Sequence, residues 1–158
     1  MSRITPFLWF NNNAEEAINF YLSVFKNARI TSSSRYTEHG PGPEGSLMVA
    51  TFELDGQKFM ALNGGPMYPF TNAISLVVDC DNQDEVDYYW NALTANGGKE
   101  IQCGWLTDKF GLPWQVIPKA LSRYLSDPDR RRAGQAMQAM FPMKKIIIAD
   151  LKAAFERD

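Results

Sequence analysis

The first 66 residues contain short apolar runs on either side of one stretch with helical periodicity. Phe7–Phe10 is wholly apolar and strand-like, and from Ala14 to Phe25 the apolar side chains recur at helical spacing, which predicts an amphipathic helix lying on a sheet. Three further strand-like runs follow, at 30–36, 47–54 and 57–62. Asp55-Gly56 joins the last two and is typical of a tight hairpin. This half of the chain therefore predicts the order βαβββ.

The second half of the chain repeats this order. A strand is predicted at 74–78 and a helix at 84–95, and three strands follow at 99–102, 103–107 and 113–117. Placing Glu16 on Glu85 (85 − 16 = 69) aligns the apolar stripes of the two helices. The aligned pairs include Ala17 with Val86, Tyr21 with Trp90 and Val24 with Leu93. A repeat that stays in phase over a whole helix indicates two copies of one module.

We therefore expect an α+β fold in which two βαβββ modules form a curved mixed sheet with a concave pocket, followed by C-terminal helices. A chain of 158 residues has the length of one domain. Within that single domain, 1–158, module one is expected at about 1–66 and module two at about 70–118. The helical tail is expected at 119–158.

The tail has its own start and stop signals. Asp127-Pro128 is typical of a helix start with proline in the first position, and helices are predicted over 133–141 and 148–155. Three methionines lie in and after the first of these helices, namely Met137, Met140 and Met143. We expect them to pack the tail onto the sheet or onto a partner subunit.

Charge and composition restrict the partners and the compartment. The net charge is −2, and the one basic run, Arg130–Arg132, follows Asp127 and Asp129, so its arginines are expected to be solvated or paired rather than bound to nucleic acid. No apolar stretch approaches the ~20 residues of a membrane-spanning helix, and no secretory signal is found. Cys80 and Cys103 do not form a Cys-x-x-Cys pair. We expect a reduced, cytoplasmic protein without nucleic-acid or membrane partners.

Several stretches resemble the vicinal oxygen chelate superfamily, which includes glyoxalase I, bleomycin resistance proteins and extradiol dioxygenases. They are Phe7–Phe25, Phe52–Pro66, Gly104–Pro118 and Met137–Lys145. More specifically, they resemble the PhnB-like branch, often labelled 3-demethylubiquinone-9 3-methyltransferase. The resemblance covers essentially the whole chain, and it implies a homodimer in which halves of the sheets form shared pockets.

Metal-dependent members of this superfamily place a His or Gln on the first strand of each module and a Glu on its last strand, where the metal acts as a Lewis acid. Carried over to this chain, these positions fall on Pro6, Ala73, Met60 and Gln115. Proline and alanine side chains have no ligand atom, and a thioether is too soft for the usual metals of such a site. The only histidine, His39, lies in the Gly/Pro-rich loop 37–46. We therefore expect no metal and no other cofactor.

The resemblance then implies a metal-free protein that binds a small apolar or aromatic molecule. The residues expected to contact this ligand are Leu8, Phe10, Met60, Ser75, Trp105 and Gln115. Alternation along the strands from the four mapped positions puts most of these side chains on one apolar face with few polar groups. Gln115 is the strongest candidate, because its amide can both donate and accept there. Each of these side chains can alternatively fill the core.

The sequence also allows other functions. Asn63-Gly64-Gly65-Pro66 ends a hairpin strand instead of opening a helix. The sequence therefore lacks the nucleotide-binding turn of a usual methyltransferase, which argues against that activity. A cofactor-independent enzyme would use Gln115 together with His39 or Tyr36. The loop 37–46 would carry these two residues as a lid, unless it is a plain solvent loop. An interaction module would instead use the tail helices.

Overall fold

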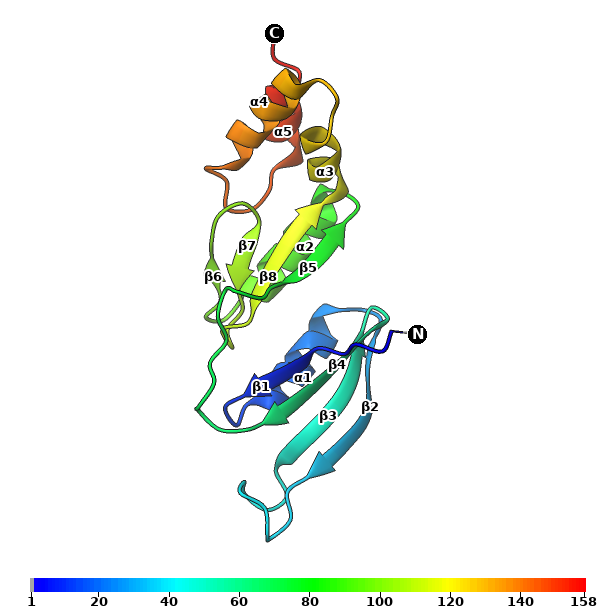
Figure 1. The fold of residues 1–158 in the computed structure, drawn as a ribbon, viewed down its shortest axis with the longest axis vertical. Helices are drawn as coiled ribbons and strands as arrows, with labels where there is room; N and C mark the ends of the chain where they lie inside the picture. Colours follow the sequence, from blue (N-terminus) through cyan, green and yellow to red (C-terminus); the bar gives the residue numbers. More distant parts are fainter. Residues whose placement is uncertain (1) are drawn as a thin grey trace. The chain divides into compact units, whose positions relative to one another are not determined.

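A computed structural model describes residues 2–158, which divide into two compact units, 2–70 and Thr71–Asp158. The first unit is the first βαβββ module (Figure 1). Its elements are β1 (Phe7–Phe10), α1 (Ala14–Val24), β2 (Ala28–Arg35), β3 (Leu47–Leu54) and β4 (Gln57–Asn63). The strand order is β1-β4-β3-β2, with β1 parallel to β4 and the other pairs antiparallel.

Helix α1 covers one face of this first sheet. Its stripe of Ala17, Ile18 and Tyr21 is buried, and it packs on β3 and β4, where Phe52 and Ala61 are fully buried. The alternating burial along β3 and β4 is the pattern of a sheet with one face on the core and one face open. The prediction of a βαβββ module is therefore confirmed for this half.

The second unit contains the second module and the tail. Its module comprises β5 (Leu76–Cys80), α2 (Gln83–Thr94), β6 (Lys99–Glu100), β7 (Trp105–Thr107) and β8 (Pro113–Pro118). The strand order β5-β8-β7-β6 and the parallel pairing of β5 with β8 repeat the topology of the first sheet. Helix α2 packs on β8 and β7 through buried Val86, Trp90 and Leu93.

The tail forms three helices, α3 (Lys119–Leu125), α4 (Arg130–Met140) and α5 (Ile148–Phe155), which lie beyond the end of β8 (Figure 1). Leu121, Ile146 and Leu151 form their core, and Met140 and Met143 pack against it. Ile117 of β8 joins the same cluster. Packing of the tail onto the second sheet is therefore confirmed for these two methionines, whereas Met137 is 38% exposed.

Some predicted boundaries were wrong. The strand predicted at 74–78 lies at Leu76–Cys80, because Ile74 belongs to an exposed turn. Helix α3 lies in the tail expected to be helical, 119–158, but it was not predicted as a separate helix. Helix α4 begins at Arg130 rather than at Pro128, since the side chain of Asp129 accepts hydrogen bonds from the first backbone N–H groups and is the N-cap. Arg132 lies 3.6 Å from the Asp129 carboxylate, in agreement with the paired arginines expected from the sequence.

No helix among the described residues is long and apolar enough to span a membrane.

The two cysteines have different environments. Cys80 is fully buried, and burial together with the charges of Glu85, Asp79 and Asp81 raises the pKa of its thiol to about 12. Cys103 is only half-buried. Because the thiolate is the reactive form, N-ethylmaleimide at pH 8 is expected to label Cys103 in the folded protein and to label Cys80 only after unfolding. Peptide mass spectrometry measures both rates, and equal labelling in the folded state would contradict this assignment.

The same pKa shift has a consequence for stability at alkaline pH. The folded-state pKa of Cys80 lies above the value of about 8.5 for an unfolded thiol. The stability contributed by the buried, protonated Cys80 thiol is therefore fully present at neutral pH. It is lost as the pH rises from about 8.5 towards 12, because the unfolded chain can then release this proton more easily than the folded one.

Candidate functional site

The open face of the first sheet, opposite α1, is largely apolar. The pairing of Phe7 with Met60 and of Trp9 with Leu62 puts these four side chains on one face. All are half-buried or exposed. The indole N–H of Trp9 donates to the carbonyl of Gly65 at 2.9 Å, so this ring is held in place.

The structure separates the predicted ligand-contacting residues of the first module. Met60 lies on the open face, as expected, but Leu8 and Phe10 lie on the opposite face, towards the core, where Phe10 is only 2% exposed. Phe10 instead packs edge-on against Phe70, with ring centroids 5.2 Å apart. The predicted shared face was therefore wrong by one residue in β1. Leu8 and Phe10 fill the core, and Phe7 and Trp9 take the open face.

On the second sheet the prediction of a shared face is confirmed. Gln115 in β8 pairs with Trp105 in β7 and with Val77 in β5, so these three side chains lie side by side on the face opposite α2. Ser75 precedes β5 and reaches the same place, because its hydroxyl accepts a hydrogen bond from the Gln115 amide nitrogen at 2.9 Å. Trp105 and Gln115 are half-buried, and Val77 is 55% exposed.

The polar groups of this open face retain hydrogen-bonding capacity. The Gln115 amide nitrogen uses one hydrogen on Ser75. Within residues 2–158 no donor is bound to Gln115 Oε1, and neither the Ser75 hydroxyl proton nor the Trp105 indole N–H has an acceptor. One acceptor and three donors, counting the second hydrogen of the Gln115 amide, therefore border the Trp105 ring and the Val77 side chain. This is the mixture of few polar groups and apolar surface typical of ligand sites.

The tail limits the open face at one end. Ile117 follows Gln115 on the same face of β8, but it packs against the tail cluster of Leu121, Ile146 and Leu151. Two backbone hydrogen bonds hold this junction, from Cys103 N to Met143 O at 2.7 Å and from Gly104 N to Lys144 O at 2.8 Å. Sequence reasoning did not find this boundary, because no local pattern links β7 to residues forty positions away.

Tyr36 and His39, the two acid–base candidates at the loop 37–46, have different environments within the first unit. Tyr36 is buried, and its hydroxyl donates to the carbonyl of Asn63 at 2.6 Å. Gly40 and Gly42 lie against its ring, so closely that a Cβ at Gly42 would lie 2.4 Å from a ring carbon. His39 is 87% exposed and pairs with neighbouring Glu38. The Tyr36 hydroxyl is therefore engaged within the first unit, and His39 lies at its surface.

The donor set does not fit a divalent metal. Among residues 2–158 no three His, Cys, Asp or Glu side chains gather as a metal cluster. The side chains at the predicted positions and beside them on the open faces are a thioether at Met60, a phenyl ring at Phe7, an amide at Gln115 and a hydroxyl at Ser75. These groups are poor ligands for Mg²⁺, Mn²⁺ or Zn²⁺, so no catalytic step through a metal is derived.

The Gly64-Gly65 pair serves the first sheet and not a nucleotide. It follows β4, and no helix begins after it before α2. A Cβ at Gly64 would lie 2.3 Å from the Trp9 ring, and the Gly65 carbonyl accepts the Trp9 indole N–H. The two glycines therefore allow the backbone to wrap around Trp9.

Comparison with known proteins identifies the relatives of this chain. The sequence model of the family described as 3-demethylubiquinone-9 3-methyltransferase matches residues 2–117. A solved PhnB protein from Bacillus cereus, described under the same activity, is 40% identical with a TM-score of 0.69, over 74% of this chain and 99% of its own. A protein from Pseudomonas aeruginosa is 25% identical with a TM-score of 0.62, over 75% of this chain and 98% of its own. No curated protein matches.

More distant structures share the fold alone. The fosfomycin resistance protein FosX from Listeria monocytogenes, solved with Mn(II) and sulfate, is 16% identical with a TM-score of 0.53, over 78% of this chain and 97% of its own. A glyoxalase/bleomycin resistance protein from Albidiferax ferrireducens is 15% identical with a TM-score of 0.50, over 75% of this chain and 99% of its own. The family match ends at residue 117, which leaves 158 − 117 = 41 residues outside it.

Proposed function

Because this chain belongs to the 3-demethylubiquinone-9 3-methyltransferase family and has the vicinal oxygen chelate fold, we propose that it is a metal-free protein that binds a small, largely apolar or aromatic molecule on its open sheet faces. The observation that carries this proposal is the group formed by Gln115, Ser75 and Trp105. This group offers free hydrogen-bonding atoms beside an aromatic ring. The open face of the first sheet, which carries Met60, is a separate apolar surface within the first unit.

The chemistry of the group indicates what the ligand carries. A hydroxyl or carbonyl beside an aromatic ring would pair with the Gln115 amide and the Ser75 hydroxyl. The flat part of the ligand would stack on or pack edge-on against the Trp105 indole. The family description names a methyltransferase, but the Gly64-Gly65 turn wraps Trp9 and opens no helix, so the residues favour binding over methyl transfer.

Native mass spectrometry of the freshly purified protein tests this proposal. We expect a small organic mass that is retained under native conditions and released on denaturation, without stoichiometric metal. The substitution Gln115→Leu removes the amide at nearly constant size and is expected to lower the retained ligand about tenfold. The matched control Gln138→Leu changes an exposed glutamine in α4 and is expected to keep the ligand.

Two outcomes of this experiment would contradict the proposal. One divalent metal bound per chain would show that the ligand set has been misidentified. Unchanged ligand occupancy in a folded Gln115→Leu variant would remove Gln115 from the site. The same spectra report the oligomeric state, for which we propose a cytoplasmic homodimer of twice 17.9 kDa, as the family resemblance implies.

A further inference from the structure

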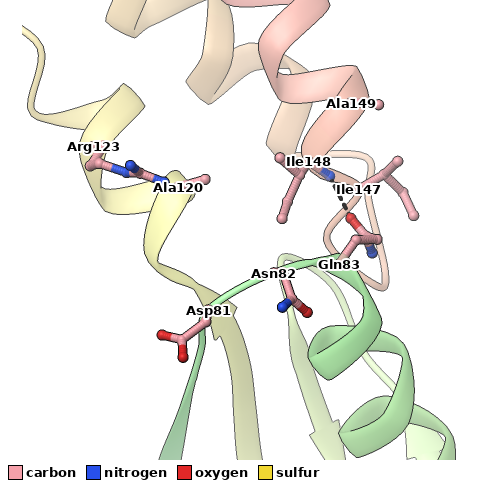
Figure 2. Close-up of a pocket in the computed structure, with 8 residues that line it drawn as sticks. All are labelled: Asp81, Asn82, Gln83, Ala120, Arg123, Ile147, Ile148 and Ala149. Atoms are coloured by element: carbon pink, nitrogen blue, oxygen red, sulfur yellow. Dashed lines mark hydrogen bonds between the residues drawn. The ribbon is translucent and has the colours of Figure 1, made fainter.

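A second candidate site lies in the second unit, away from the open sheet face. A cleft of about 480 Å³ opens between the tail and the end of β5 (Figure 2). The turn from β5 to α2 lies on one side of the cleft, α3 on another, and the start of α5 on the third. A volume of this size is in the range of small-molecule sites, which is roughly 300–1,000 Å³.

This cleft depends on the part of the chain outside the family match. Of its lining residues, Ala120, Arg123 and Ile148 all follow residue 117, where the match ends. The cleft is therefore not part of the module that the relatives share. It is separate from the group around Gln115, none of whose members lines it.

The walls of the cleft are held together by specific contacts. The Gln83 side chain bridges the two sides, because its amide nitrogen donates to Ile146 O at 3.0 Å and its amide oxygen accepts from Ile148 N at 2.8 Å. The ion pair of Lys145 with Asp87, at 2.8 Å, links the same segments. The cleft is thus preformed, which reduces the entropic cost of binding.

The charges that line the cleft leave one cation without a partner. The Asp81 carboxylate pairs with Lys119, and no Asp, Glu or carbonyl oxygen within residues 2–158 binds the Arg123 guanidinium. Asn82 uses its amide oxygen to accept from Glu85 N at 3.0 Å, so its amide nitrogen keeps its donors. The hydrogen-bonding groups left for a ligand are therefore mainly donors, and they favour an anion.

The other side chains that line the cleft are mostly apolar, and the net positive charge of the tail favours the binding of an anion. The side chains of Ala120, Ile147, Ile148 and Ala149 line the cleft. The segment 119–158 carries 9 Lys and Arg against 5 Asp and Glu, a net charge of 9 − 5 = +4, whereas residues 1–118 carry 7 − 13 = −6. An anion with an apolar body matches both the positive tail and the aliphatic walls.

We propose that this cleft binds a small organic carboxylate, with its carboxylate group on the Arg123 guanidinium and its apolar body against Ile147 and Ile148. Arginine suits this role because its fork of N–H donors matches a carboxylate in a bidentate pair. The ligand class follows from the unpaired guanidinium and the apolar walls.

Titration of the isotope-labelled full chain with sodium benzoate, followed by amide NMR, tests the proposal. Benzoate is expected to bind with a Kd of about 1 mM or tighter and to shift the amide signals of Gln83, Ala120 and Ile148. Benzamide, the neutral analogue, is expected to bind at least about tenfold more weakly. Equal binding of the two probes, or no shift at these amides with ~20 mM benzoate, would overturn the proposal.

Substitutions on two walls give independent checks. Arg123→Gln is expected to weaken benzoate binding at least about tenfold, whereas Arg123→Lys keeps the charge but loses the bidentate fork and is expected to weaken binding by a smaller factor. Ala149→Trp fills the cleft from an exposed position and is expected to abolish the shifts. Arg157→Gln and Ala153→Trp are matched controls, because both residues are exposed and lie outside the cleft lining. Wild-type binding by Arg123→Gln or by a folded Ala149→Trp variant would overturn the proposal.

One more variant separates this site from the proposed function. Gln115→Leu is expected to leave benzoate binding at the cleft unchanged, because Gln115 lies outside the cleft lining. Shifts confined to Trp105 and Gln115 would assign benzoate to the open sheet face and would overturn the cleft proposal while supporting the other.

Discussion

Replacing Asp108 with alanine is expected to lower the free energy of unfolding by about 3 kcal/mol. Asp108 is only 2% exposed and lies in the turn between β7 and β8. Its Oδ1 accepts from Phe110 N at 2.9 Å and from Leu112 N at 3.1 Å, and its Oδ2 accepts from the Trp114 indole at 2.9 Å. Alanine leaves these donors without this acceptor in a buried turn, where the cost of desolvation is not recovered. Urea unfolding at pH 7 measures the loss.

Two further variants identify the cause of this loss. Asp108→Asn keeps Oδ1 for the two backbone donors and turns an NH₂ group towards the Trp114 indole N–H, so about 2 kcal/mol is expected. Glu44→Ala removes an exposed carboxylate and is expected to change stability by less than about 0.5 kcal/mol. If Asp108→Ala were as stable as Glu44→Ala, the turn would not depend on the carboxylate.

The interaction between Asp108 and Trp114 also affects the candidate site. Trp114 is 3% exposed and lies on the α2 side of β8, so the next residue, Gln115, must face the open side. A weakened turn is therefore expected to disturb the position of the Gln115 amide without changing any residue of the site. Ligand retention by Asp108→Asn is informative for this reason.

The face of β8 was predictable from the sequence, whereas the face of β1 was not. In β8 the alternation of Trp114, Gln115 and Val116 contains one polar residue, and this polar residue marks the open side. The run Phe7–Phe10 is apolar at every position, so its periodicity carries no information about which side chains face the core. The pairing of Phe7 with Met60 decides the face, and register of this kind depends on tertiary contacts.

The repeat predicted both modules, but the docking of the tail was not predictable. The contact of Gln83 with Ile146 and Ile148 joins residues more than sixty positions apart, and no local pattern encodes it. In the sequence, Arg123 is one charged residue among many in the tail. Only the fold reveals that it lines a cleft with apolar walls.

Replacing Asn63 with leucine is expected to destabilise the first unit by about 2–3 kcal/mol. Asn63 is 7% exposed and ends β4. Its amide oxygen accepts from Ala14 N at 2.8 Å, and its amide nitrogen donates to Leu47 O at 3.0 Å. The local N-cap residue, Asn13, makes no side-chain hydrogen bond to the helix. Asn63, at the end of β4, therefore caps α1 in its place. Leucine has a similar size but can form neither the hydrogen bond with Ala14 N nor the one with Leu47 O.

Asn63→Asp separates the two hydrogen bonds by their dependence on pH. A carboxylate can accept from Ala14 N, but only a protonated carboxyl can donate to Leu47 O. The pKa of the new carboxyl in the folded state is therefore expected to lie above the unfolded value of about 3.9. Because the pKa is raised in the folded state, the variant is expected to approach wild-type stability below pH ~4. This stability is lost as the pH rises through the folded-state pKa.

Urea midpoints of wild type, Asn63→Asp and the exposed control Asn72→Leu, compared at pH 4 and pH 7, measure this difference. Equal stability of Asn63→Asp and wild type at pH 7 would mean that the bond to Leu47 contributes nothing. The attachment of α1 would then rest on the bond to Ala14 N and on the apolar stripe of the helix.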